Sequence, residues 1–165
     1  MSRGRAYRAT VAKDLIRVEV DTVSYALEVA RVREIVNPLP VIALPRERPF
    51  VLGVADYREQ VVTVVDLRRL FGLPAQEPSR RTKWIIIEAS ERVVGVVVDA
   101  VLDVFSSAEH QLEVPVLDER HRERGIISAS RHADRLVFLL DADRLVEPAM
   151  ALSPDEMSLL PSEGP

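Results

Sequence analysis

The chain has 165 residues, enough for one domain or for two small ones packed closely together. Hydrophobic residues make up 47% and charged residues 29%, as in a globular protein with a real core, and the net charge of -4 argues against a dedicated nucleic-acid binder. Cysteine is absent, which excludes disulfides, a thiolate nucleophile and a cysteine-ligated metal. No apolar run approaches the roughly 20 residues that span a bilayer, so we expect a soluble, cytoplasmic protein.

The first third of the chain predicts a tail followed by strands. Residues 1–13 carry scattered charges without a period and predict a flexible tail. Alternating polar and apolar residues rich in Val, Ile and Tyr predict strands over 15–37. The prolines within 37–49 interrupt the sheet, because proline cannot donate a hydrogen bond to a neighbouring strand. Strands return at about 51–55 and 60–65.

A short helix follows the last of these strands. Asp66 stands at the strand-to-helix junction, where its carboxylate can accept hydrogen bonds from the free amides of the first turn. Residues 67–71 would form the helix, and Gly72 its C-terminal cap. The polar segment 75–83 predicts an exposed connector.

The second half again predicts strands and ends in helices. The mixed charged sequence of 106–124 predicts a loop, and residues 151–165 predict a short C-terminal helix with a tail. The other expected elements are strands at 84–88, 93–98, about 125–130 and 135–140, and a helix from Asp141 that this residue caps.

Two stretches of the sequence are repeated. Residues 61–70 end an apolar run in Asp followed by an Arg-Leu helix, and 136–145 repeat the pattern. Residues 26–35 align in the same way with 95–104. A period this long indicates one packed unit repeated in tandem, here a duplicated small barrel. Such a fold without an evident catalytic group favours holding partners together over transforming a substrate.

Three histidines recur every eleven residues, at His110, His121 and His132. A metal site would need them to converge with a fourth ligand, and all three lie in polar sequence expected to form loops. Solvated histidines are the favoured interpretation. A metal-dependent hydrolase that uses these histidines and the aspartates is the competing hypothesis.

Four aspartates are candidates for acid–base chemistry: Asp66, Asp99, Asp103 and Asp141. Capping explains Asp66 and Asp141 without catalysis, and their repetition favours a structural role. We therefore assign no catalytic residue. The basic cluster at 80–83 is interpreted as a solvated connector, because a nucleic-acid-binding barrel would need a basic stripe and more aromatic residues than 5%.

Glu34 and Arg58 interrupt segments that are otherwise apolar. The simpler interpretation places Glu34 on a solvent-facing side of its strand. The alternative places Glu34 and Arg58 side by side on a groove, where charges at the rim orient a partner and neighbouring apolar side chains supply affinity.

These same residues belong to motifs by which the sequence resembles the CheW-like coupling proteins of bacterial chemotaxis, over about residues 14–160. The motifs are an aromatic-Ala-Leu triplet, Val-x-Glu-Ile, a proline-rich stretch, a Gly-Val segment ending near an Arg, and an apolar run closed by Asp-Leu-Arg. They stand at 25–27, 32–35, 39–49, 53–59 and 61–68, and the likeness continues through 94–104 and 136–145.

The resemblance implies a mainly β fold over residues 14–150, in which two small SH3-like, five-stranded β-barrel subdomains pack together with a few short helices. It implies a non-enzymatic adaptor without cofactors that couples a chemoreceptor (a methyl-accepting protein) to a CheA-type histidine kinase at the inner face of the membrane. The partners would be the regulatory domain of the kinase and the cytoplasmic hairpin tip of the receptor, whose helix would lie in the groove between the barrels. Neither nucleic-acid binding nor membrane insertion is expected.

Residue by residue, Val32, Glu34 and Arg58 match family positions associated with receptor binding, and Gly53 matches a position tied to coupling. Two residues depart from the family pattern. Glu59 replaces a turn glycine, the residue best able to take a positive φ, which opens the turn to another backbone shape, and Thr63 replaces a common proline. The alternative is therefore a divergent scaffold that binds only one of these partners or serves a pathway other than motility.

Overall fold

The computed structural model describes residues 12–44, 48–109, 113–115 and 118–150. The tail expected over 1–13 lies outside the described residues except for its last two positions, and the helix expected within 151–165 lies wholly outside them. None of the helices in the described ranges is long and apolar enough to cross a membrane.

Strands dominate the fold, as expected. The strands are β1 (Asp14–Val20), β2 (Val23–Glu28), β3 (Val32–Val36), β4 (Val51–Tyr57), β5 (Gln60–Asp66), β6 (Lys83–Ala89), β7 (Arg92–Val98), β8 (Ala100–Ser106), β9 (Glu113–Pro115), β10 (Ile126–His132) and β11 (Arg135–Leu140). The helices are α2 (Leu67–Leu70), α3 (Glu119–Glu123) and α4 (Ala142–Met150), with 3-10 turns η1 (Val29–Arg31) and η2 (Ser107–Glu109).

Two parts of the chain differ from the sequence prediction. The pattern predicts no separate strand at 100–106, where β8 lies; a shift in its pairing between Val101 and Asp103 breaks the alternation of buried and exposed residues. The stretch 106–124 was expected to be a loop but contains η2, β9 and α3. Because α3 buries no residue, it has no apolar face that a periodicity could reveal.

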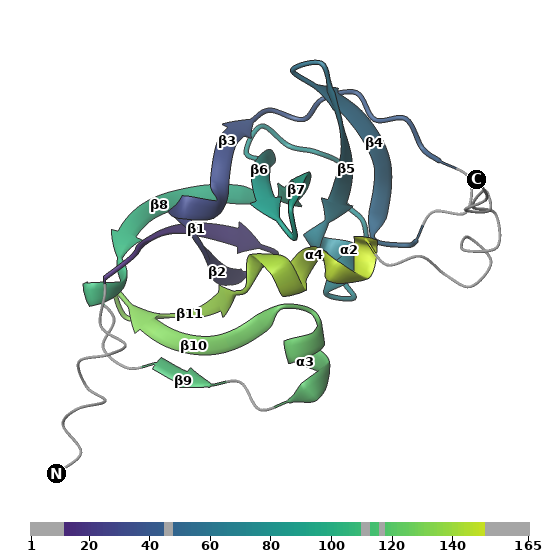
Figure 1. Ribbon diagram of the computed structural model, residues 1–165. Coiled ribbons are helices and arrows are strands. Elements are labelled where there is room, and N and C mark those ends of the chain that lie inside the picture. The colour runs from purple at the N-terminus through teal and green to yellow at the C-terminus, as the bar shows by residue number, and fades with distance from the viewer. Residues whose placement is uncertain (1–11, 45–47, 110–112, 116–117, 151–165) are drawn as a thin grey trace, which may run out of the picture.

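The strands of the described chain form two sheets (Figure 1). The six-stranded sheet has the order β8-β1-β2-β11-β10-β9, and the five-stranded sheet has the order β3-β6-β7-β5-β4. Neighbouring strands run antiparallel except for two parallel pairs, β2 with β11 and β5 with β7. This architecture confirms the predicted fold class, with three-residue β9 as an additional edge strand.

The sequence repeat is visible in the sheets, but each sheet is assembled from both halves of the chain. Strands β1 to β5 of the first half correspond in order to β6, β7, β8, β10 and β11 of the second half. Corresponding strands have corresponding neighbours, so that the parallel pair β5–β7 corresponds to the parallel pair β11–β2. The pairing also shifts at matching places, between Val32 and Glu34 in β3 and between Val101 and Asp103 in β8. The tandem arrangement of one barrel per repeat is therefore wrong: the two halves exchange strands.

Buried apolar side chains form three clusters within the described residues. The largest, which we call the seam, lies between the sheets and joins Ile16 and Leu27 of the six-stranded sheet to Ile85 and Val96 of the five-stranded sheet. A smaller cluster belongs to each sheet alone. One contains Ala55, Tyr57, Val62, Val64, Trp84 and Ile86, and the other Leu15, Ala26, Phe105 and Val137.

Strand β6 shows how one strand serves two clusters. Ile85 and Ile87 point into the seam, whereas Trp84 and Ile86 point into the small cluster of the five-stranded sheet. Successive side chains of a strand face opposite sides, so all four are buried, each at 2% exposure or less. The continuous apolar run in the sequence is therefore a strand with two covered faces.

Each copy of the repeat ends in a capped helix. Asp66 Oδ1 accepts a hydrogen bond from the Arg68 amide at 3.1 Å at the start of α2. Asp141 Oδ1 accepts from the amides of Asp143 and Arg144 at 3.0 and 3.2 Å at the start of α4. Both aspartates thus lie at helix N-termini with capping geometry.

We expect Asp66→Ala to lower the free energy of unfolding by about 0.5–2 kcal/mol, because the amide of Arg68 loses its acceptor. Chemical denaturation monitored by circular dichroism measures the change. Asp66→Asn is the matched control, since asparagine caps about as well, and it should stay within a few tenths of a kcal/mol of the parent. Equal losses in both variants would contradict the capping role.

Candidate functional site

Glu34 on β3 and Arg58, next to the end of β4, lie side by side. Arg58 donates from Nε to Glu34 Oε1 at 2.9 Å and from Nη2 to Oε2 at 3.0 Å, a bidentate ion pair. The Tyr57 hydroxyl donates to the same Oε1 at 2.6 Å. We call these three residues the Glu34 cluster. It is accessible to solvent, since the side chain of Arg58 is 71% exposed and that of Glu34 33%.

The Glu34 cluster joins the two edges of the five-stranded sheet, because β3 and β4 end its strand order. The six-stranded sheet has a comparable contact, in which Phe105 of β8 stacks on His132 of β10 with ring centroids 4.0 Å apart. Each sheet therefore curls until side chains at or near its two edges touch.

The Glu34 carboxylate is held in its charged form. Hydrogen bonds from Arg58 first and from Tyr57 second lower the pKa of Glu34 to about 2. The hydrogen bond to Glu34 raises the pKa of the Tyr57 hydroxyl, so that this group stays protonated and keeps donating. The ion pair is accordingly complete throughout the physiological pH range.

Val32 and Ile35 are the apolar residues of β3 that precede and follow the charged pair Arg33-Glu34. Val32 pairs with Ile87 and is partly buried against the seam. Ile35 is 39% exposed. Of the expected receptor-binding residues, the structure therefore brings Glu34 and Arg58 into contact and turns Val32 towards the interior.

Gly53 has a packing reason to be glycine. Its φ is +143°, and a Cβ added there would lie 2.2 Å from the carbonyl oxygen of Ile42. The backbone at Ile42 pairs with Val54 through hydrogen bonds of 2.8 and 2.9 Å in both directions. Gly53 thus lets the segment before β4 lie directly against that strand.

The turn that contains Arg58 has the positive φ values that glycine adopts most easily, although neither residue there is glycine. Arg58 and Glu59 have φ values of 48° and 66°, the positive pair found in type I′ hairpin turns. The corresponding turn between β10 and β11 has Ala133 and Asp134 at 50° and 64°. The replacement of the family glycine by Glu59 has therefore left the turn in the positive-φ region.

The two histidines that the structure describes lie apart from each other. His121 is on α3, with Nδ1 at 3.6 Å from Asp118 Oδ2, and His132 stacks on Phe105 at the other end of β10. His110 lies outside the described residues. Within the described part of the chain, no group of three His, Cys, Asp or Glu residues could hold a metal ion.

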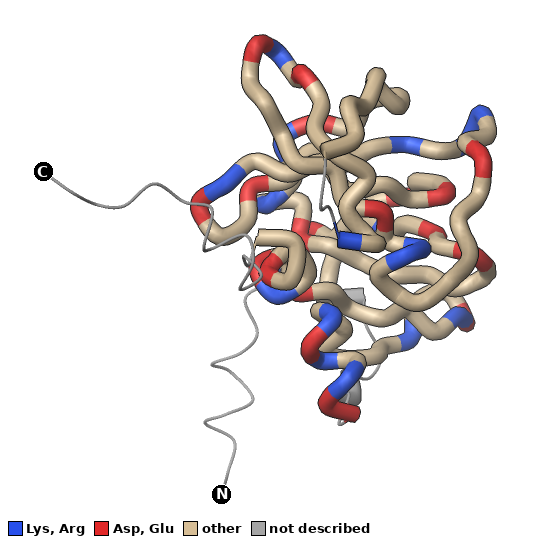
Figure 2. The backbone as a smooth tube through the Cα atoms, turned by 90° about the vertical axis from the view of Figure 1, so that its right-hand side faces the viewer, with Lys and Arg blue, Asp and Glu red and all other residues tan. Residues whose placement is uncertain are grey.

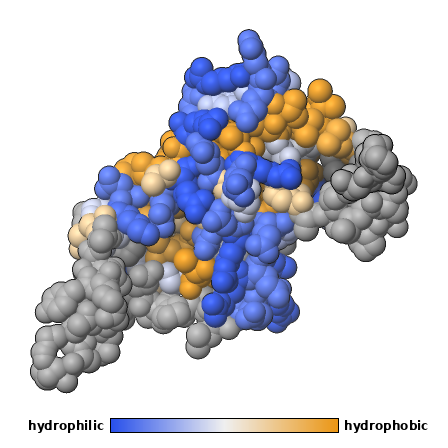
Figure 3. All heavy atoms as spheres, in the orientation of Figure 1, coloured by the Kyte–Doolittle hydropathy of each residue, from blue (hydrophilic) through white to orange (hydrophobic). Residues whose placement is uncertain are grey.

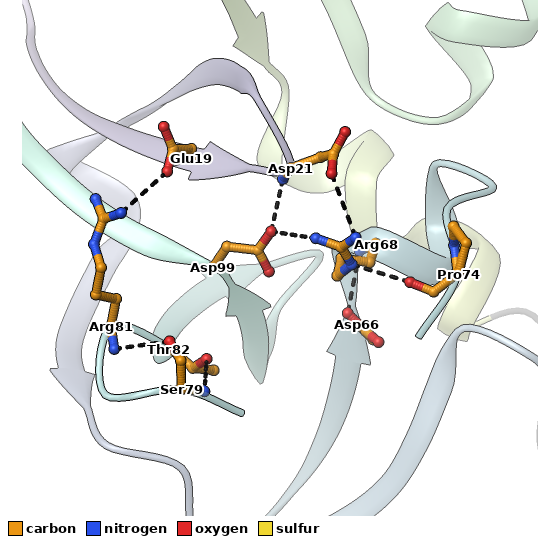
Figure 4. Close-up of polar contacts among 9 residues, drawn as sticks. All are labelled: Glu19, Asp21, Asp66, Arg68, Pro74, Ser79, Arg81, Thr82 and Asp99. Atoms are coloured by element: carbon orange, nitrogen blue, oxygen red, sulfur yellow. Dashed lines mark hydrogen bonds and ion pairs between the residues drawn. The ribbon is translucent and has the colours of Figure 1, made fainter. Parts of the chain in front are cut away.

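A polar network around Arg68, which the sequence analysis did not single out, links the two sheets (Figure 4). Arg68 of α2 pairs with Asp99 and donates a hydrogen bond to the carbonyl of Pro74 at 3.0 Å. Asp99 also accepts a hydrogen bond from the amide of Asp21 at 2.6 Å. Asp21 is in the β1–β2 turn, so this network ties the six-stranded sheet to the helix that follows β5.

The same position in the second repeat is occupied by Asp143 of α4. Its carboxylate pairs with Arg31 at 2.8 and 2.9 Å and accepts the amide of Ser90 at 2.8 Å. Hydrogen bonds from Arg31 and Ser90 lower the pKa of Asp143 to about 2. The sequence repeat aligns Arg68 with Asp143, which was a signal for these two networks. Opposite charges at aligned positions do not, however, predict a shared role.

Exposed apolar residues also follow the repeat. Ile35 corresponds to Val104 and Val61 to Leu136, with exposures of 39%, 59%, 74% and 53%. Val41, Ile42 and Leu44 are also exposed, and Ile42 pairs with Val54 of β4. Figure 3 shows hydrophobic surface in the part of the molecule where Figure 1 places β4. These exposed apolar side chains are candidate contact points for other proteins.

Charged residues have no such concentration. Figure 2 shows basic and acidic residues interspersed along the chain, and many of those in the described ranges are paired with each other. This distribution gives the visible face no basic stripe of the kind that binds a nucleic-acid backbone.

The two-sheet β fold, the exposed apolar side chains and the ion pair at a sheet edge together define a class of protein, a β module that binds other proteins. The family model described as the CheW-like domain matches residues 14–149. Similar proteins include the chemotaxis protein CheW of Rhizobium meliloti, 28% identical over 87% of this chain and 93% of that protein, and that of Bacillus subtilis, 29% identical over 80% and 86%. CheW of Thermotoga maritima is 27% identical over 81% and 87%.

The fold is also that of a solved relative. The crystal structure of the scaffolding protein TtCheW from Thermoanaerobacter tengcongensis matches with a TM-score of 0.72 at 22% identity, covering 83% of this chain and 94% of that one. The chain belongs to the CheW-like family. It is accordingly a non-enzymatic adaptor of the chemotaxis class.

We expect the Glu34 carboxyl to titrate with a pKa of about 2 in the folded protein. The unfolded value is about 4.3, so the stabilisation from this ion pair is complete above that pH and is lost as the pH falls through about 2. Side-chain carboxyl shifts followed by NMR over this range measure the pKa. Arg58→Ala should return it most of the way to 4.3, and an unchanged value in that variant would contradict the pairing.

We expect Glu59→Gly to raise the free energy of unfolding by about 1 kcal/mol, because glycine takes a φ of 66° without the steric penalty of a side chain. Urea denaturation measures the difference. Gln60→Gly is the control: Gln60 begins β5, and glycine there should destabilise. A loss of stability in Glu59→Gly would show that the Glu59 side chain makes a compensating contact.

Proposed function

We propose that this chain couples a chemoreceptor to a CheA-type histidine kinase at the inner face of the membrane. The kinase would dock through its regulatory domain, and the receptor through the hairpin tip of its cytoplasmic part. The Glu34 cluster carries the proposal: a preformed, solvent-accessible ion pair of Glu34 and Arg58 on a sheet edge, next to the exposed Ile35. A rigid charged pair of this kind orients a partner, while apolar neighbours supply affinity.

An adaptor needs more than one docking face, and the duplicated fold offers related surfaces on both sheets. Ile35 and Val61 belong to the five-stranded sheet, and their counterparts Val104 and Leu136 to the six-stranded sheet. These paired surfaces favour two partners over the alternative of a divergent scaffold that binds one.

Separate titrations against each partner test the proposal. The purified chain should bind the isolated regulatory domain of the kinase and a cytoplasmic receptor fragment, and should stimulate kinase autophosphorylation only when receptor fragment is present. Binding to one partner alone would establish the divergent scaffold instead. Binding to neither would overturn the adaptor proposal for these partners.

We expect Glu34→Ala and Arg58→Ala each to weaken binding to the receptor fragment about tenfold or more, as substitution of an interface anchor does. Isothermal titration calorimetry measures the affinity, and a melting curve checks the fold. Arg33→Ala is the matched control: Arg33 neighbours Glu34 on β3, is similarly exposed and pairs with Glu88 instead. Affinity losses as large in Arg33→Ala, or none in the two test variants, would place the receptor surface elsewhere.

A further inference from the structure

The Glu34 cluster contains one buried residue and two accessible side chains. Tyr57 is 4% exposed, whereas the side chains of Arg58 and Glu34 reach solvent. The Tyr57 ring packs in the small core cluster of the five-stranded sheet, together with Trp84 and Ile86. The core therefore fixes the ring, and with it the place of the hydroxyl at its tip.

Tyr57 contacts both members of the ion pair. Its hydroxyl donates to Glu34 Oε1 at 2.6 Å, and the guanidinium carbon of Arg58 lies 5.7 Å from the centre of its ring, within the range of cation–π contacts. Arg58 Nε donates to the same Oε1 at 2.9 Å, so one carboxylate oxygen accepts from two residues. Two donors at one oxygen restrict rotation of the carboxylate, whose other oxygen accepts from Arg58 Nη2.

An exposed ion pair without such support is weakly ordered. Both side chains lose rotamer freedom when they pair, and solvent screens their attraction. The pair of Arg33 and Glu88 on the same sheet is an example, in which Nε and Nη2 of the arginine share a single oxygen of the glutamate. Within the described residues, only Arg33 donates to the Glu88 carboxylate. The Glu34 pair differs because a buried third residue holds it.

The repeated position in the six-stranded sheet lacks this arrangement. Asp103 aligns there with Glu34. His132 takes the place of Tyr57, since each is the last residue of its strand before a turn with two positive φ values. His132 stacks on an aromatic ring of β8, and Asp103 pairs instead with Arg17 of the neighbouring strand β1. A hydroxyl that spans the two sheet edges is therefore a property of Tyr57 and not a requirement of the fold.

We propose that Tyr57 is the positioning residue of the Glu34 cluster: its hydroxyl holds the carboxylate of Glu34, and thereby Arg58, in the orientation that the receptor meets. Groups ordered in advance bind more tightly, because less rotamer freedom is lost on association. The consequence for binding rests on the proposed receptor surface, whereas the hold of Tyr57 on the ion pair is a property of the free chain.

Tyr57→Phe tests that hold in the free full chain, because it removes the hydroxyl and keeps the packed ring. The pKa of Glu34 should rise from about 2 part of the way towards the ordinary value of about 4.3, since Arg58 remains as a donor. At neutral pH the Nε proton of Arg58 should exchange with water about threefold faster or more. NMR of the two side chains gives both quantities.

Tyr25→Phe is the matched control. It removes the same atom from another buried tyrosine, whose ring packs against Phe71 and Phe138 and whose hydroxyl makes no hydrogen bond within the described residues. This variant should leave the Glu34 pKa and the exchange of the arginine proton unchanged. Values like those of the parent in Tyr57→Phe, or equal changes in the two variants, would overturn the positioning role whether or not the receptor binds.

A double-mutant cycle extends the test to the receptor fragment, with affinities from calorimetry and a melting curve to check the fold. Tyr57→Phe should weaken binding about three- to tenfold in the parent, but less than about twofold in Arg58→Ala, where no pair is left to position. Equal losses in both backgrounds would overturn positioning and assign Tyr57 a direct contact with the receptor. No binding by the parent chain would overturn the proposed coupling function, and the free-chain measurements would still decide whether Tyr57 holds the ion pair.

Discussion

The apolar seam between the two sheets is the constraint on which the rest of the molecule depends. Strands β1, β2, β6 and β7 each turn one face into it, and the opposite faces of β1, β2 and β6 enter the small cluster of their own sheet. Strands β6 and β7 accordingly have uninterrupted nonpolar runs at 84–87 and 93–98, whereas β1 keeps Arg17 and Glu19 on its face away from the seam, where Arg17 pairs with Asp103. Val32 and Glu34 show the boundary on a single strand: one packs against the seam, and the other pairs with Arg58 outside.

Two polar networks flank the seam at related positions of the repeat. In one, Arg68 reaches from α2 to the β1–β2 turn, and in the other Asp143 reaches from α4 to the β6–β7 turn. In one network the helix residue is an arginine that pairs with an aspartate, and in the other it is an aspartate that pairs with an arginine. Such partly exposed pairs add little to stability and instead fix which turn each helix meets. The two halves therefore share a geometry but carry opposite charges at this repeated position.

Much of this fold could be predicted from the sequence, because the strands obey simple rules of alternation and the repeated Asp marks the start of each helix. The helix α3 could not, since it has no buried face, and neither could the exchange of strands, because a repeat in sequence does not say which copies pair. For the site, the family motifs pointed to Glu34 and Arg58, whose contact the structure supplies. The Arg68 network joins α2 to the β1–β2 turn, which lie far apart in the chain, so no local motif marks it.

The crossed assembly of the sheets also makes the two halves dependent on each other. The first half has two strands in the six-stranded sheet and three in the five-stranded sheet, and the second half has four and two, so neither half completes a sheet alone. Two identical short chains that traded their first two strands would complete both at once. In this chain the segment between Leu70 and Lys83 links the two halves covalently, so both sheets are completed within one molecule.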